Sequence, residues 1–226
     1  KHIPIFEGTH IFKANQIIID SLNDQKKLIA NGKLNHSYPH SWRSKAPLVH
    51  RATLQWFISM ESHNLRTKAL KAIEDTTFYP SKGKERIKAM IETRPDWCIS
   101  RQRVWGVPLP IFISKKNGEI LVDDEVFENI AKIYEKEGSD CWFLEDYQKF
   151  LGKKYDAKDY EKISDIVEVW FDSGSTHSFV LEIRKDLKWP ASMYLEGSDQ
   201  HRGWFHSSLL ESCGTRGRAP FENILS

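Results

Sequence analysis

An acidic turn between a short apolar run and a helix pattern constrains the fold more than any other feature. Residues 192–195 are typical of a buried strand, and the helix pattern covers 200–213. Glu196, Gly197 and Asp199 lie in the turn between them. Open α/β sheets bind ligands at such turns, at the carboxyl ends of their strands. The turn therefore predicts a site for hydroxyl or ammonium groups.

A second unit of the same kind precedes it. The apolar run 166–171 predicts a strand, and the polar residues 172–175 lead into a further helix. Two successive strand, turn and helix units favour an α/β fold with a parallel, doubly wound sheet. The remaining pattern predicts helices at 15–28, 65–73, 82–91 and 124–137, a strand at 52–60, and a hairpin of 109–113 with 119–122.

Composition excludes several classes of protein. The 226 residues are 40% hydrophobic, which is enough for a packed core rather than a disordered chain. Lys and Arg number 33 against 31 Asp and Glu, so any contact with nucleic acid must come from local patches. Cys98, Cys141 and Cys213 form no closely spaced pair, which indicates a reducing, cytoplasmic compartment. No apolar run reaches the roughly 18 residues of a membrane span.

Four long segments resemble one family. They are 36–60, 94–112, 165–178 (DIVEVWFDSGSTHS) and 194–210 (YLEGSDQHRGWFHSSLL). In wording, order and spacing they resemble isoleucyl-tRNA synthetases of the bacterial type, which are class I aminoacyl-tRNA synthetases. The valyl and leucyl enzymes share the fold, but not the wording D-Q-H-R-G-W-F.

The resemblance implies the fold and the reaction. It implies the second half of a class I Rossmann-type catalytic core with a parallel sheet, plus parts of the connective insertions. Isoleucine and ATP would form isoleucyl-adenylate, with Mg²⁺ accompanying ATP, and the acyl group would pass to tRNA(Ile). Positioning and charge stabilisation, rather than a catalytic side chain of this chain, would carry this chemistry.

The resemblance also divides the chain. Residues 1–50 would be the exit of the editing insertion, 51–107 the return into the core and the acceptor-stem region, 108–164 the second connective insertion, and 165–226 the second half of the Rossmann fold. The family's H-I-G-H and K-M-S-K-S signatures are absent. The chain begins with Lys1 and stops at Ser226 as a strand pattern begins, so we expect an internal piece of a monomeric enzyme, inactive alone.

The resemblance assigns the isoleucyl-adenylate site to Glu196, Gly197, Asp199, Gln200, Trp170 and Trp204. Each residue also has a plain structural role available. Asp199 fits a helix N-cap, Gln200 a surface amide, and the two tryptophans ordinary core packing. With the resemblance, we expect the carboxylates to hold an ammonium group or ribose hydroxyls, and the tryptophans to wall an isoleucine pocket.

Basic and aromatic residues alternate near position 100. Arg101 and Arg103 lie between Trp97 and Trp105, a pattern that favours phosphate contact and stacking with the single-stranded end of tRNA. For the basic run 82–88, a solvated helix face is the better interpretation.

A structural zinc site is not expected. Many family members carry C-W-R-C and a later C-x-x-C, whose positions here hold Ser41, Ser44, Ser114 and Asn117. Zinc needs about four good ligands, and hydroxyls are poor ones. His36 and His40 remain nearby and fit surface positions.

Two other functions stay open at this point. One is another class I synthetase, most plausibly valyl. The other is a non-enzymatic RNA-binding or assembly module that keeps the fold.

Overall fold

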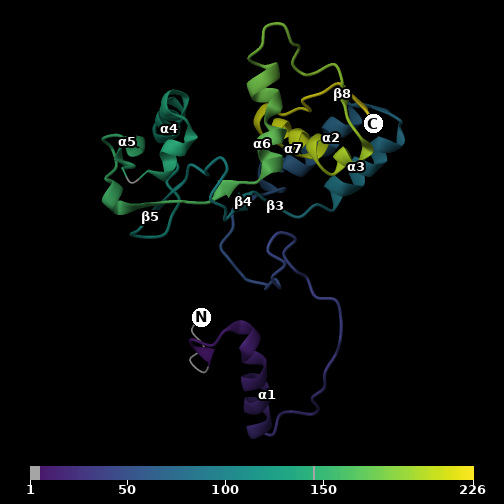
Figure 1. Cartoon of the computed structure of the whole chain (residues 1–226). Coiled ribbons are helices and arrows are strands. Elements are labelled where there is room, and N and C mark those ends of the chain that lie inside the picture. The colour runs from purple at the N-terminus through teal and green to yellow at the C-terminus, as the bar shows by residue number, and fades with distance from the viewer. Residues whose placement is uncertain (1–5, 145) are drawn as a thin grey trace. The chain divides into compact units, whose positions relative to one another are not determined.

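The chain forms two compact units in the computed structural model, which describes residues 6–144 and 146–226. The units are Lys1–Ala52 and Thr53–Ser226, and each is described by itself (Figure 1). Residues 1–5 of the predicted segment 1–50 lie outside the described residues. In the described part of the chain, no helix combines the length and apolar character needed to cross a bilayer.

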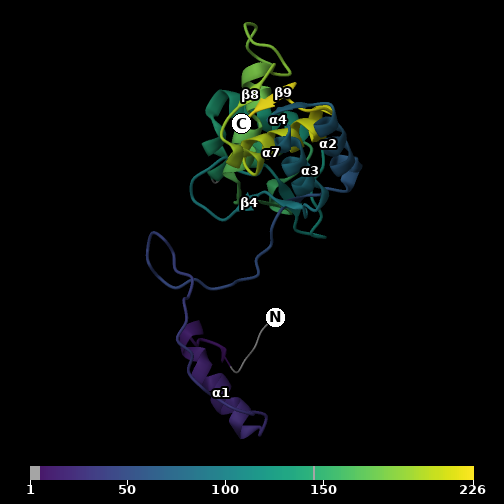
Figure 2. The ribbon, with the colours of Figure 1, turned by 90° about the vertical axis from the view of Figure 1, so that its right-hand side faces the viewer.

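The first unit contains little regular structure. A 3₁₀ turn, η2 (Ile11–Lys13), leads into α1 (Ala14–Asp24), and no residue of α1 is buried. A long segment without helix or strand follows α1 (Figure 2). The predicted helix 15–28 ends early because Lys26 adopts a positive φ of 55°, which breaks the right-handed helix.

A parallel sheet of three short strands lies at the centre of the second unit. Its order is β2 (Thr77–Tyr79), β9 (Asn223–Leu225) and β8 (Tyr194–Leu195). Both pairings are parallel, with Phe78 and Tyr194 each opposite Ile224. The sequence predicted β8 and β9, whereas β2 was not predicted.

Three helices bury this sheet (Figure 1). They are α2 (Leu65–Glu74), α3 (Lys82–Glu92) and α7 (Trp204–Arg216). Ile87 and Ile91 of α3 stand four residues apart and are fully buried, whereas residues 205–213 of α7 are all buried. Each fully buried aliphatic side chain stabilises the fold by roughly 1.5–3 kcal/mol. Helix α7 therefore lies in the core, and its first turn is held firmly.

The predicted strand 166–171 is wrong beyond its first two residues. Only Ile166–Val167 forms a strand, β7, and it pairs antiparallel with β4 (Ser100–Arg101), outside the parallel sheet. Helix α6 (Val169–Gly174) begins directly afterwards because the Glu168 carboxylate accepts the Trp170 N–H and caps it. The doubly wound arrangement of two equivalent units is therefore not what the chain adopts.

Residues 108–163 build a second hydrophobic cluster around Phe112, Trp142 and Phe150. Its elements are β5 (Phe112–Ser114), α4 (Asp124–Glu137), η4 (Ser139–Phe143), α5 (Gln148–Leu151), η5 (Ala157–Asp159) and β6 (Tyr160–Lys162). Strand β5 pairs with β6, and only the bridge between Ile113 and Ile120 remains of the predicted hairpin. Helix α4 has the predicted bounds.

The remaining elements connect these parts. They are β1 (Phe57–Ile58), η3 (Ser62–Asn64), β3 (Trp97–Cys98), the π-helical turn His177–Leu181 and η7 (Ser198–His201). Strand β1 pairs antiparallel with β3, so the predicted strand 52–60 shrinks to two residues.

Candidate functional site

The turn after β8 exposes two carboxylates at the carboxyl end of the parallel sheet. The backbone N–H of Glu196 donates to Leu225 of β9 (3.2 Å), which continues the ladder by one residue. The Glu196 side chain is exposed, and its carboxylate accepts only a long bond, 3.4 Å, from the Gly197 N–H among the described residues. Asp199 is also exposed, in η7. Both side chains therefore remain able to accept hydrogen bonds from a ligand.

Gly197 allows the turn to close on itself. A Cβ atom at this position would lie 2.7 Å from Asp199 Oδ1, which is closer than a real side chain approaches. The absence of a side chain thus lets the Asp199 carboxylate fold back against the backbone.

Gln200, rather than Asp199, caps helix α7. Its Oε1 accepts the Trp204 N–H (2.9 Å), and its Nε2 donates to Asp199 Oδ2 (3.0 Å). The interpretation of Asp199 as the N-cap is wrong, because α7 begins after Gly203 and Asp199 lies in η7. Gln200 is also more than a surface amide, since it links the start of the helix to the acidic turn.

Trp204 is held by packing on two sides. Its ring stacks on Tyr194 with 4.0 Å between centroids and 3° between planes, and its Nε1 donates to the Ser173 carbonyl (3.0 Å). Trp170 lies on α6 with 42% of its surface exposed. Its ring reaches Gly203, so the structure brings both tryptophans to the start of α7. The partner Tyr194 was missed, although an aromatic residue in the preceding strand was the available signal.

Glu168 is a second residue that the sequence pattern did not single out. It is buried, and it accepts hydrogen bonds from Trp97 Nε1 (2.8 Å) and the Trp170 N–H (3.2 Å). Arg101 approaches its carboxylate at 3.7 Å. Glu168 therefore fixes the start of α6, which carries Trp170.

The predicted tRNA-contact residues divide into two groups. Arg101 donates to the carbonyls of Cys98 (3.1 Å) and Ser100 (2.7 Å) while 44% of its side chain stays exposed, whereas Trp97 is buried, so the Trp97 ring is not free for stacking. Arg103 is exposed, its side chain has no partner in the described part of the chain, and Trp105 is 84% exposed. Arg103 and Trp105 are therefore the least engaged of these residues, and contact of either arginine with tRNA stays a prediction.

Two of the four basic residues in the run 82–88 on α3 form ion pairs with other described residues. Lys84 and Lys88 both bind Glu74 of α2, at 2.7 and 2.9 Å. These contacts hold the Glu74 pKa at about 2, chiefly through the hydrogen bonds from the two lysines. The solvated-face interpretation of this run fits the geometry.

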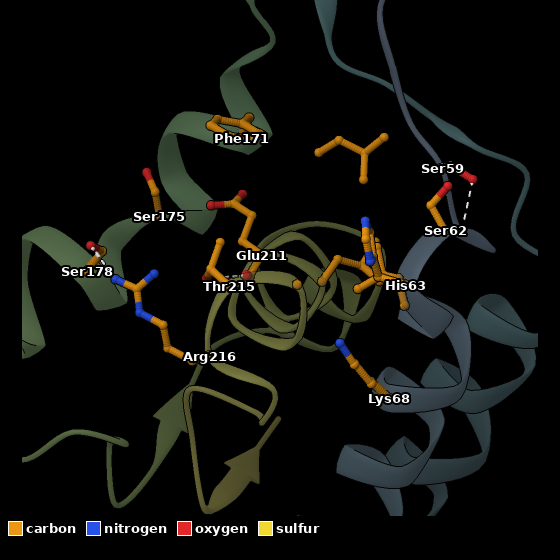
Figure 3. Close-up of a pocket in the computed structure, with 14 residues that line it drawn as sticks. Ser59, Ser62, His63, Lys68, Phe171, Ser175, Ser178, Glu211, Thr215 and Arg216 are labelled. Atoms are coloured by element: carbon orange, nitrogen blue, oxygen red, sulfur yellow. Dashed lines mark hydrogen bonds between the residues drawn. The ribbon is translucent and has the colours of Figure 1, made fainter. Parts of the chain in front are cut away.

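A cavity of about 440 Å³ lies beside α2, α6 and α7, and the six predicted adenylate residues do not line it. Glu211 of α7 projects its carboxyl group toward Phe171 and Ser175 (Figure 3). Its Oε1 is buried and has no hydrogen-bond partner among the described residues. Burial, followed by the nearby charges of Asp172 and Glu168, raises the Glu211 pKa to about 9, so this carboxyl is neutral at pH 7.

No metal centre is evident in residues 6–144 and 146–226. No group of three or more His, Cys, Asp and Glu side chains in these ranges is arranged to hold a metal ion. Asn117, one of the four positions considered for a zinc site, donates its side-chain N–H to Glu119. The expectation of no structural zinc stays a prediction.

Comparison with known proteins gives one consistent family. Residues 5–226 match the model of tRNA synthetases class I (I, L, M and V). The chain is similar to isoleucine–tRNA ligases of Pelagibacter ubique, with 80% identity over all of this chain and 25% of that protein, and of Mesorhizobium japonicum, with 56% identity over 94% of this chain and 22% of that protein. It thus spans about a quarter of the length of these relatives. On this evidence, the chain belongs to the class I tRNA synthetases of the I, L, M and V group.

Proposed function

We propose that this chain forms one wall of the isoleucyl-adenylate site in an isoleucine–tRNA ligase. The observation that carries the proposal is the 80% identity over the whole chain to a protein named isoleucine–tRNA ligase. Such a ligase joins isoleucine to ATP as isoleucyl-adenylate and transfers the acyl group to tRNA(Ile). In this proposal, residues 165–226 belong to the second half of the Rossmann-type core and 108–164 to the second connective insertion. Segment 51–107 returns from the editing insertion, whose exit is 1–50, and the enzyme is a monomer in the cytoplasm.

The acidic turn binds the polar part of the adenylate. The exposed Glu196 carboxylate accepts hydrogen bonds from the ammonium group or a ribose hydroxyl, and Gly197 lets the backbone come close to the ligand. Asp199 accepts ribose hydroxyls with the oxygen that Gln200 leaves free, since Gln200 donates to the other one. Because Gln200 is anchored to α7, the carboxylate is oriented before the ligand arrives, which lowers the entropy lost on binding.

The two tryptophans contact the isoleucine side chain. Trp204 is fixed by Tyr194 and Ser173, whereas Trp170 keeps an exposed face for a ligand. An apolar pocket separates side chains that differ by one methylene only modestly, with isoleucine against valine as the well-known example. The pocket is therefore a first filter rather than the whole of the specificity.

The exposed Arg103 and Trp105 contact the acceptor end of tRNA(Ile). An arginine binds a phosphate while a neighbouring aromatic ring stacks on an unpaired base. Arg101 acts in this proposal only indirectly, by shaping the strand that leads to Arg103. Mg²⁺ accompanies the phosphates of ATP, and we assign it no ligand from this chain.

A chimera tests the proposal. The 226 residues replace the matching quarter of the Pelagibacter ubique ligase, and amino-acid-dependent exchange of pyrophosphate into ATP is measured. We expect exchange with isoleucine and much less with valine. Preference for valine would favour a valyl enzyme, and no exchange at all would favour the non-enzymatic module. The isolated chain, which lacks the family's nucleotide signatures, is expected to show no exchange.

A further inference from the structure

We propose that Gly203 is a positioning residue that sets the distance between Trp170 and Gln200, and with it the width of the isoleucine pocket. The inference rests on the function proposed above. Gly203 is buried at the start of α7, between η7, which carries Gln200, and α6, which carries Trp170. It lies where the polar and the apolar halves of the proposed site meet.

The absence of a side chain at position 203 is what allows this approach. A Cβ atom there would lie 2.5 Å from Gln200 Oε1 and 2.8 and 2.9 Å from Trp170 Cη2 and Cζ3. Real Cβ atoms essentially never come within 3.0 Å of such atoms. Because the contacts with Gln200 and with Trp170 are both shorter than 3.0 Å, alanine at this position forces both neighbours to move.

Trp170 is the neighbour that moves further. Gln200 is held at both ends, by the Trp204 N–H at 2.9 Å and by Asp199 at 3.0 Å. The Trp170 ring is 42% exposed, and its Nε1 has no hydrogen-bond partner among the described residues. Displacing the ring toward solvent costs less than breaking the two hydrogen bonds of Gln200, so Gln200 shifts only as far as these bonds allow and the larger displacement falls on the apolar wall.

Gly214 supplies a matched control on the same helix. The nearest atom to a Cβ at Gly214 is Leu65 Cδ1 at 3.7 Å, which is an ordinary van der Waals contact. Gly214→Ala thus adds the same methyl group to α7 without a clash. It also lies outside the proposed adenylate site.

The experiment measures steady-state pyrophosphate exchange in the Pelagibacter ubique chimera. We expect Gly203→Ala to raise KM for isoleucine by about tenfold, because a shift of the Trp170 ring misplaces one wall of the isoleucine pocket. We expect KM for ATP and kcat to stay within about twofold, since the Asp199–Gln200 pair is retained. Gly214→Ala should leave all three constants unchanged.

A double-mutant cycle identifies the cause. Phenylalanine lacks the Cη2 and Cζ3 atoms that a Cβ at position 203 would strike, so Trp170→Phe removes the contacts with Trp170 and leaves the one with Gln200 Oε1. In the Trp170→Phe background, Gly203→Ala should therefore raise KM for isoleucine by only about threefold. If Gly203→Ala folds poorly by itself, the double variant should regain stability in urea unfolding.

Different results would contradict the proposed function and the role of Gly203. A wild-type chimera without isoleucine-dependent exchange contradicts the proposed function, and with it the role of Gly203 in the pocket. If the wild-type chimera exchanges normally, either of two results would contradict the Gly203 inference alone. One is an unchanged KM for isoleucine in Gly203→Ala, and the other is an equal rise of KM in both Trp170 backgrounds.

Discussion

Two segments of this chain share a sequence pattern but differ in structure. Both run from apolar residues through an acid into a helix, one at 166–174 and the other at 194–216. In the first, Glu168 turns inward and binds Trp97 Nε1 and the Trp170 N–H. In the second, Glu196 stays exposed, with one long hydrogen bond. The partners of an acid, rather than its place after a strand, therefore decide whether its carboxylate is used within the fold or stays available for other contacts.

Replacing Glu168 should produce the largest loss of stability. Glu168→Ala leaves the buried Trp97 Nε1 without an acceptor and α6 without its cap, so we expect the free energy of unfolding to fall by about 3 kcal/mol. Urea unfolding of the chain measures this, with Glu196→Ala expected to change stability by less than about 0.5 kcal/mol. If the free energy of unfolding fell equally in Glu168→Ala and Glu196→Ala, the two segments would not differ in the way described above.

Replacing Glu196 should instead act on the chemistry. In the chimera, Glu196→Ala removes a charge-assisted contact to the adenylate, so kcat/KM for isoleucine-dependent exchange should fall by about 100-fold. Glu168→Gln provides a comparison in the same exchange assay, because the glutamine side-chain oxygen can still accept the hydrogen bond from Trp97 Nε1. If Glu196→Ala exchanges normally, the exposed acid is an ordinary turn residue.

Glu211 should make the stability of the chain depend on pH. Its pKa rises from 4.5 to about 9 on folding, so between these values the unfolded chain loses a proton that the folded chain keeps. The stability contribution of this group is therefore greatest below pH 4.5 and declines as pH rises toward 9. Between pH 5 and pH 8 we expect a decline on the order of 4 kcal/mol, which Glu211→Gln should remove.

His206 is the group to separate from this effect. Burial lowers its pKa to about 3, so its contribution to stability is lost as pH falls from 6.5 toward 3. Since His206 is present in both proteins, the difference between wild type and Glu211→Gln isolates Glu211. A difference that stays constant from pH 5 to pH 8 would contradict the raised pKa.

The smallest expected effect concerns the two arginines. Arg103→Ala removes an exposed cation, so KM for tRNA(Ile) in aminoacylation by the chimera should rise by about threefold, and more so at low salt. Exchange without tRNA should be unaffected, as only the tRNA contact is lost. Arg101→Ala, by contrast, should lower stability, because Arg101 binds two carbonyls and faces Glu168. If KM for tRNA(Ile) rose in Arg101→Ala but not in Arg103→Ala, the roles assigned to the two arginines would be wrong.

Long helices and the strand–turn–helix unit at 194–216 followed from sequence. Periodicity located α2, α3 and α4, because an amphipathic pattern over three turns has few alternatives. Strands β2, β4 and β6 carry only two or three residues each and were not predicted, whereas the equally short β8 was found through the turn and helix that follow it. The apolar run 166–171 is compatible with either a strand or a buried helix. The structure forms a helix after Val167 because Glu168 caps it.

The sequence by itself determined the family and the placement of acids and tryptophans near one turn, because four long motifs in a fixed order rarely coincide by chance. Only the tertiary structure decided which acid is buried, that Gln200 rather than Asp199 caps α7, and that Gly203 separates Gln200 from Trp170. These facts depend on distances between residues of separate elements. Such distances arise from packing, which a pattern along one chain does not encode locally.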